Sequence, residues 1–239
     1  MNVAGLIFSN IHDQSIPEMA RMRTMASIPF GCRYRLIDFA LSNMVNADIN
    51  TVGVITHYNY QSLLDHIGTG KDWDLARRSG GIKILPPYVA AYENTAAGKL
   101  YSSRLEALMG AEHFINRCGA DYIVLSDCDV VMNIDLGEVL EDHVKSGAYL
   151  TMVTKHLNAD EYRFDKVVNL VRAVSRAKPE HGEVDVNTNI YVIKRTDLQS
   201  IIADSLAHGY TSFSRDVVRA NLDKKLIRAY RYDGWYAYI

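Results

Sequence analysis

Residues 28–43 read IPFGCRYRLIDFALSN, and alternating strand and helix signals continue on both sides of this stretch. The apolar run VAGLIF at 3–8 predicts a strand, and a helix is expected over 33–47. Further strands are predicted at 51–56, 122–126, 149–155, 167–174, 188–194 and 226–232, and further helices at 59–68, 100–116, 136–146, 197–208 and 213–222. Strands separated by helices indicate an α/β fold with a mostly parallel sheet, whose sites lie at the carboxyl ends of strands.

Length and composition fit one large domain with a well-buried core, since the chain has 239 residues. The 26 basic and 28 acidic residues leave a net charge of −2, which implies no nucleic-acid partner. No apolar stretch is long enough to span a bilayer, and the start lacks the basic segment of a signal peptide. The odd number of cysteines and their spacing predict free thiols in a reducing cytoplasm: Cys32, Cys118 and Cys128.

Two segments depart from the regular alternation. The pairs Gly80-Gly81 and Pro86-Pro87 bracket a region expected to be rich in loops, either a lid over a site or a surface excursion. The last ten residues, 230–239, read as strand material with no stop signal. This end suits two alternatives, a domain over 1–239 that is truncated near its end, which we expect, or a natural short protein.

The stretch 28–43 resembles the signature of glucose-1-phosphate adenylyltransferases, which make ADP-glucose from ATP and glucose 1-phosphate for glycogen or starch synthesis. The resemblance covers nearly the whole chain and is greatest to the divergent subunit that accompanies the catalytic one. It implies a Rossmann-like, glycosyltransferase-A-like nucleotidyltransferase domain with a mixed sheet flanked by helices. It also implies a left-handed β-helix domain in the full protein that is absent from this chain. Further matches follow in the family's order at 54–58, 133–135, 178–179, 190–192 and 216–218.

The loop after the first strand has no glycine between Gly5 and Gly31. A glycine-rich turn there would leave bare backbone N–H groups for phosphate oxygens, and side chains would block that approach. The family's loop approximates Gly-Gly-x-Gly-x-Arg-Leu, so the resemblance implies that this phosphate cradle is lost. It also places Met25 at the position of the catalytic lysine. A thioether carries no charge, so we expect Met25 to be a packing residue.

The metal site of the family uses two aspartates. The resemblance places Asp129 on the first and Tyr238 on the second, and a neutral phenol is a poor Mg²⁺ ligand. Asp127 lies two residues before Asp129 and would share its strand face if the strand continued. Two readings of Asp127 remain: it holds a cation together with Asp129, or it caps the following turn.

Other candidate residues follow from the resemblance. Thr95, Lys178 and Asn189 are candidates for substrate binding, although the base-binding motif around Thr95 has lost its glycine and aspartate. Lys178 keeps a positive charge that suits a phosphate, or is an ordinary surface lysine. Arg33 and Arg35 are candidates for a phosphorylated effector; the alternative is that both sit on an amphipathic helix and pair with carboxylates.

Two functions are compatible with these residues. The first is a cytoplasmic, non-catalytic regulatory subunit that forms a hetero-oligomer with a catalytic glucose-1-phosphate adenylyltransferase, without a cofactor of its own. The second is an active but divergent nucleotidyltransferase that uses Mg²⁺ held by Asp127 and Asp129. Losing the cradle, the lysine and one metal aspartate together favours the first.

Overall fold

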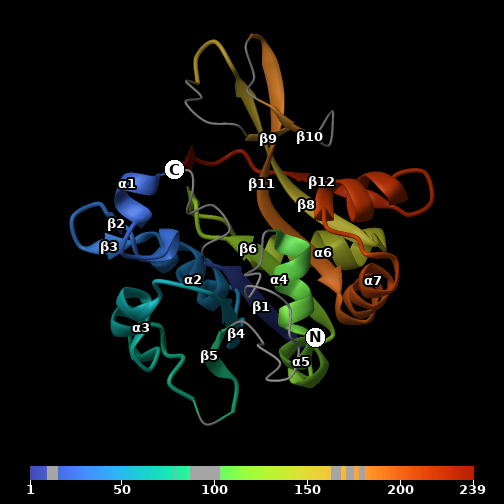
Figure 1. Ribbon diagram of the computed structural model, residues 1–239. Helices are drawn as coiled ribbons and strands as arrows, with labels where there is room; N and C mark the ends of the chain where they lie inside the picture. The colour runs from blue at the N-terminus through green and yellow to red at the C-terminus, as the bar shows by residue number, and fades with distance from the viewer. Residues whose placement is uncertain (10–15, 78, 87–102, 163–167, 171–174, 178–180) are drawn as a thin grey trace.

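In the computed structural model, β1 (Val3–Phe8) lies inside the sheet between β4 (Thr51–Ile55) and β6 (Tyr122–Asp127), and it pairs with both in parallel (Figure 1). The parallel strand β5 (Gly81–Leu85) follows beyond β4. The structure describes residues 1–9, 16–77, 79–86, 103–162, 168–170, 175–177 and 181–239. Parallel strands of this kind are covered on both faces, which explains why β1 is apolar at every position.

The other half of the sheet is mainly antiparallel. β11 (Glu183–Lys194) pairs antiparallel with both β6 and β8 (Leu150–Asn158), and β12 (Ile227–Arg231) pairs in parallel with β8. β9 (Val168–Leu170) and β10 (Ser175–Ala177) extend the sheet beyond β11. The described residues thus form a nine-stranded mixed sheet, and the predicted fold class is confirmed.

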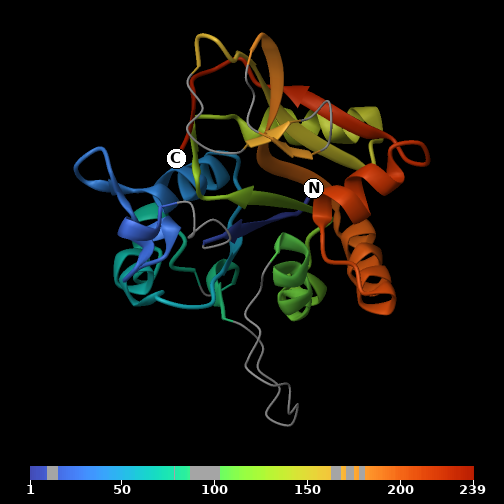
Figure 2. The same cartoon turned by 45° about the horizontal axis from the view of Figure 1, so that its top comes forward.

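Helices cover both faces of this sheet (Figure 2). One face packs against α2 (Leu36–Asn46), α3 (Gln61–Ile67) and α6 (Leu136–Ser146). The other packs against α4 (Arg104–Gly110), α5 (Glu112–Arg117), α7 (Arg195–His208) and the π-helical turn η4 (Phe213–Arg219). Within β1, Ile7 belongs to the first core and its neighbours Leu6 and Phe8 belong to the second, as the two-residue period of a strand requires.

Several elements differ from the sequence predictions. The stretch between Gly81 and Leu85 is strand β5, so the prediction of loops there is wrong. The helix expected over 33–47 begins only at Leu36, and the one expected over 100–116 is divided into α4 and α5 at Ala111. Strand β13 (Tyr236–Tyr238) lies within the last ten residues, which read as strand material in the sequence. The other short elements were not predicted: α1 (Pro17–Ala20), η2 (Met25–Ser27), β2 (Pro29–Phe30), β3 (Tyr34–Arg35), η3 (Lys71–Trp73) and β7 (Val130–Met132).

Within the described part of the chain, none of the helices has both the length and the apolar character needed to cross a membrane.

Candidate functional site

The candidate site lies where the parallel strands β1 and β6 end side by side. Phe8, the last residue of β1, is in register with Asp127, the last residue of β6. Ser9 follows β1, is fully buried, and its backbone oxygen accepts a hydrogen bond from the Ala26 N–H at 3.0 Å. The turn η2 therefore closes over the end of β1. Most of the glycine-free loop, residues 10–15, lies outside the described residues.

Met25 lies in this turn and is fully buried in the core. Its side chain faces the same apolar cluster as Ile7 and Leu41. The resemblance places the catalytic lysine of the family at this position. A thioether has no strong hydrogen-bonding group to satisfy, so it needs no polar partner when it is buried in this cluster. The apolar surroundings of Met25 therefore suit its side chain.

Asp127 forms a buried ion pair with Arg104, the first residue of α4. The Arg104 Nη2 donates to Asp127 Oδ2, and the two side chains are 8% and 1% exposed. The guanidinium carbon lies 5.4 Å from the ring centre of Phe8 and 5.4 Å from that of Tyr191, within the range of cation–π attraction. Asp127 thus has Arg104 as the cation at its Oδ2 atom, and its predicted roles as a metal ligand or as a cap of the following turn stay predictions.

The ionisation of this cluster follows from its burial and its charges. Burial disfavours the charged guanidinium and is the largest single effect, but the carboxylate of Asp127 with Tyr191 and Asp129 together outweigh it, so the pKa of Arg104 lies above its ordinary value. Burial raises the pKa of the Tyr191 hydroxyl, which keeps it neutral. Arg104 is therefore a permanent internal cation whose charge is already compensated by carboxylates.

The candidate Asn189 lies near this cluster, in an irregular part of β11. The pairing of β11 with β8 shifts register between Asn187 and Tyr191, and Asn189 there has a φ of 61°. The Asn187 side chain donates to the Tyr191 hydroxyl and accepts from the Asn189 N–H at 3.0 Å. Asn tolerates the left-handed conformation better than most residues, which accounts for its presence in this bulge.

Asp129 and Tyr238 lie on neighbouring segments. Tyr238 of β13 is in register with Val130 of β7, and the Ile239 N–H donates to the Asp129 backbone oxygen at 2.9 Å. Asp129 is fully buried. Burial, together with the charge of Asp129, raises the pKa of Tyr236. Strand β6 ends at Asp127 and does not continue to Asp129, so the condition under which the two carboxylates would share one strand face is not met.

The donor set at this point does not fit a Mg²⁺ ion held by two carboxylates. Asp127 is engaged by Arg104, and the second position next to Asp129 carries the phenol of Tyr238. Mg²⁺ prefers carboxylate and water oxygens in an octahedral arrangement, and a neutral phenol supplies no negative charge. Among the described residues, no group of three His, Cys, Asp or Glu side chains is arranged to hold a metal.

The remaining predicted residues lie apart from this cluster. Arg33 is exposed, and its guanidinium carbon lies 5.9 Å from the ring centre of Tyr34. Arg35 Nη1 donates to the backbone oxygen of Ser62 at 2.5 Å and to its hydroxyl at 2.7 Å. Both arginines precede α2, so placing them on a helix was wrong. Thr95 and Lys178 lie outside the described residues.

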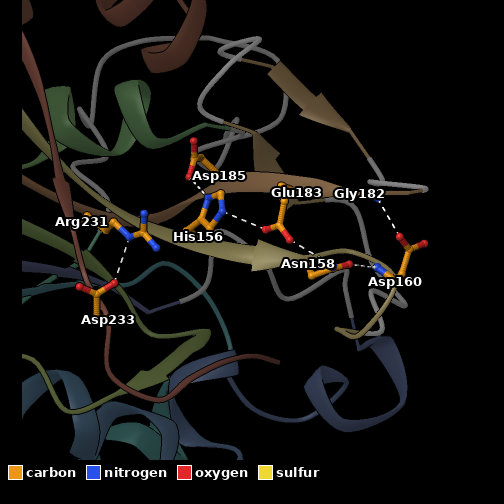
Figure 3. Close-up of polar contacts among 8 residues, drawn as sticks. All are labelled: His156, Asn158, Asp160, Gly182, Glu183, Asp185, Arg231 and Asp233. Atoms are coloured by element: carbon orange, nitrogen blue, oxygen red, sulfur yellow. Dashed lines mark hydrogen bonds and ion pairs between the residues drawn. The ribbon is translucent and has the colours of Figure 1, made fainter.

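A second polar cluster lies on the extended ribbon of β8 and β11 (Figure 3). The two ring nitrogens of His156 lie 2.9 Å from Glu183 Oε2 and 2.7 Å from Asp185 Oδ1. At the ribbon's end, Asp160 pairs with His181 at 2.8 Å and accepts from the Gly182 N–H at 3.0 Å. Since these groups are engaged with one another, the cluster fastens the ribbon.

Comparison with known proteins identifies the family. The model of the nucleotidyl transferase family matches residues 19–235. The chain belongs to this family. The chain is also similar in fold to a Bacillus anthracis protein described as a glucose-1-phosphate thymidylyltransferase, crystallised with sucrose. That similarity has a TM-score of 0.69 at 18% identity and covers 99% of this chain and 89% of the other.

The curated relatives of the chain have more specific names. It is 32% identical to a glucose-1-phosphate adenylyltransferase of Clostridium perfringens, over 98% of this chain and 61% of the relative. It is 27% identical to one of Halalkalibacterium halodurans, over 98% and 62%. It is 30% identical to the glycogen biosynthesis protein GlgD of Bacillus subtilis, over 98% and 59%. The chain thus spans about three fifths of the length of these relatives.

Arg104 was missed by reasoning from sequence, although a local signal existed. Ser103 caps α4 by accepting from the Glu106 N–H at 3.2 Å, and a serine followed three residues later by glutamate is typical of a helix start. That pattern places Arg104 in the first turn, where the helix dipole disfavours a cation. A basic residue in such a position indicates a compensating carboxylate nearby.

Proposed function

We propose that this chain is a regulatory, non-catalytic member of a glucose-1-phosphate adenylyltransferase assembly in glycogen synthesis. In this proposal it pairs, in the cytoplasm, with a catalytic subunit of the same fold and alters that subunit's kinetics. Its similarity to enzymes of that name and to a glycogen biosynthesis protein supports the pathway. The nucleotidyl transferase fold supports a partner built in the same way.

The buried Arg104–Asp127 pair is the observation that carries the non-catalytic part of the proposal. Nucleotidyl transfer depends on cations that offset the charge of the transferred phosphoryl group. Here the internal cation is already compensated by Asp127 and, at longer range, Asp129. Met25 in the lysine position and Tyr238 in the second aspartate position leave the site without the other charges that this chemistry uses.

Regulation of a partner would require this subunit to favour one state of the complex over another. A ligand or subunit shifts a conformational equilibrium only by its difference in affinity for the two states. The proposal therefore predicts that mixing changes kcat or KM of the catalytic subunit and that the two proteins form a stable complex.

The test is pyrophosphate release from ATP and glucose 1-phosphate with Mg²⁺. The protein is assayed alone and then with the catalytic paralogue from the same source. We expect no release above background for the protein alone, and an altered kcat or KM for the mixture. Size-exclusion chromatography of the mixture checks that the two proteins associate.

The opposite outcome would identify a divergent enzyme. Mg²⁺-dependent release by the protein alone, abolished in Asp129→Asn, contradicts the regulatory proposal. Asp233→Asn is the matched control, because Asp233 is 80% exposed and removing its charge leaves the candidate site unchanged. Failure of the mixture to differ from the catalytic paralogue alone would also contradict it.

A further inference from the structure

A polar cleft opens at the edge of the sheet opposite to the candidate site. Lys194, the last residue of β11, is in register with Tyr122, the first residue of β6. Asp127 is at the other end of β6, about 17 Å away at the rise of an extended strand. The cleft therefore lies apart from the Arg104–Asp127 pair, and its role does not depend on the proposed function.

The walls of the cleft are held in place by backbone hydrogen bonds. The Tyr149 N–H donates to the Leu226 oxygen at 2.9 Å, which joins the starts of β8 and β12. The Arg195 N–H donates to the Asp121 oxygen at 2.9 Å, which fixes the start of α7 next to β6. The cleft has a volume of about 370 Å³, within the range of small-molecule sites.

The charge of the cleft is positive. Its lining includes three lysines, Lys194, Lys224 and Lys225, against the one carboxylate of Asp197, which leaves a formal charge of +2. Two of the three acidic residues on the adjoining helix α6 have cations of their own: Asp142 binds Arg228 at 2.5 Å, and Glu141 binds Lys145 at 3.0 Å. The third, Glu138, accepts a hydrogen bond from the Tyr230 hydroxyl at 3.3 Å. Among the residues that line the cleft, Asp197 is the one carboxylate that can offset the charge of the three lysines, so an external anion can meet the remaining positive charge.

A buried histidine and aromatic rings form the floor. His143 is 2% exposed, lines the cleft, and its Nδ1 lies 2.8 Å from Thr151 Oγ1. Burial lowers the pKa of His143, which keeps its ring neutral and able to take part in a directed hydrogen bond. Tyr122 packs edge-on against this ring at 5.5 Å, and Lys225 Nζ lies 5.2 Å from the ring centre of Tyr149.

We propose that this cleft binds a small organic phosphate ester, with the phosphate group on the lysines and the organic part against the tyrosine and histidine rings. A phosphate monoester carries a charge of about −1.5 to −2 near neutral pH, which matches the charge of the cleft. The three lysine ammonium groups supply hydrogen-bond donors for the phosphate oxygens. The neutral ring of His143 carries no negative charge, so it does not repel the phosphate.

The test is isothermal titration calorimetry of the protein with glucose 6-phosphate and, separately, with inorganic phosphate. We expect saturable binding of the ester and weaker binding of inorganic phosphate. The double variant Lys194→Gln/Lys225→Gln should lose at least about tenfold in affinity, as expected for removing two charge-assisted contacts. The control Lys71→Gln/Lys83→Gln removes the same charge from exposed lysines that do not line the cleft, and it should bind like the parent.

A second measurement locates the ligand without relying on the variants. Histidine ring resonances are followed by NMR during the titration, and the His143 signal is assigned by its loss in His143→Gln. We expect the His143 signal to move in parallel with the calorimetric binding, and that of His113, which does not line the cleft, to stay in place. No saturable binding, an unmoved His143 signal, or equal weakening in both double variants would overturn the proposal. If inorganic phosphate bound as tightly as glucose 6-phosphate, the proposed contact between the organic part of the ligand and the aromatic rings would be overturned.

Discussion

Arg104 shows how a full positive charge is accommodated inside this domain. Its guanidinium is planar and weakly hydrated, so its faces can lie against Phe8 and Tyr191 while its edge reaches Asp127. The pair is isolated from water, so each partner depends on the other for compensation. The positive charge of Arg104 is consequently used to hold the folded core together.

Replacing Arg104 alone should be strongly destabilising. Arg104→Met leaves the Asp127 carboxylate buried without its guanidinium, and we expect a loss of about 3–5 kcal/mol in the free energy of unfolding. The double variant Arg104→Met/Asp127→Leu removes both charges and should be more stable than Arg104→Met. Urea unfolding of the three proteins measures this, and a double variant as unstable as the single one would show that the pairing is not responsible.

The sequence could be used to place some of the site residues but not to pair them. The resemblance assigns Asp129, Tyr238 and Met25 to positions along the chain, because motifs are local. The contact between Arg104 and Asp127 joins residues 23 positions apart and depends on how α4 packs against β6. Such a buried pair is decided by tertiary packing, which neither spacing nor periodicity encodes.

At the scale of elements, the long and regular segments were predictable. Strand β1 and helix α6 have the predicted bounds, 3–8 and 136–146, because an apolar run and an amphipathic period of 3.6 are strong signals. Strand β5 was missed because it has only five residues and lies between a glycine pair and a proline pair. Glycine and proline pairs signal turns, and here that signal hid the short strand. Strand β7 was missed because it has only three residues, too few for a period of two to appear.

Helix α6 depends on its N-cap. The Asp135 side chain accepts hydrogen bonds from the Gly137 N–H at 2.8 Å and the Glu138 N–H at 3.3 Å. Asp135→Ala removes both, and we expect a loss of about 1 kcal/mol in unfolding free energy by urea denaturation. Asp135→Ser keeps a capping oxygen and should retain most of the stability. If the alanine and serine variants were equally stable, the cap would not contribute as described.

At the scale of the whole molecule, tyrosines are unusually prominent, with 15 in the chain. Burial raises the pKa of six of the described ones: Tyr149, Tyr162, Tyr191, Tyr230, Tyr232 and Tyr236. These hydroxyls lie in different parts of the domain, from Tyr149 just before β8 to Tyr236 in the last strand. Folding of the domain therefore favours the protonated form of each of these tyrosines.

This linkage predicts loss of stability in alkali. Because the folded pKa values lie above the unfolded value of about 10, the stabilisation is complete below pH 10 and is lost as the pH rises through the folded values. Ultraviolet absorbance of tyrosinate should show some tyrosines ionising only as the protein unfolds. In concentrated urea all should titrate together near pH 10. A folded protein whose tyrosines all ionise near pH 10 would contradict this prediction.

The central position of β1 has a consequence for synthesis on the ribosome. Its two neighbours in the sheet are β4 and β6, and β6 begins only at Tyr122. At about 5–20 residues per second, this partner is translated on the order of ten seconds after β1. During that interval the segment VAGLIF has no charge and no proline, the composition of segments that pair with other chains. A nascent chain halted before Tyr122 is therefore the form of this protein that most needs protection by a chaperone.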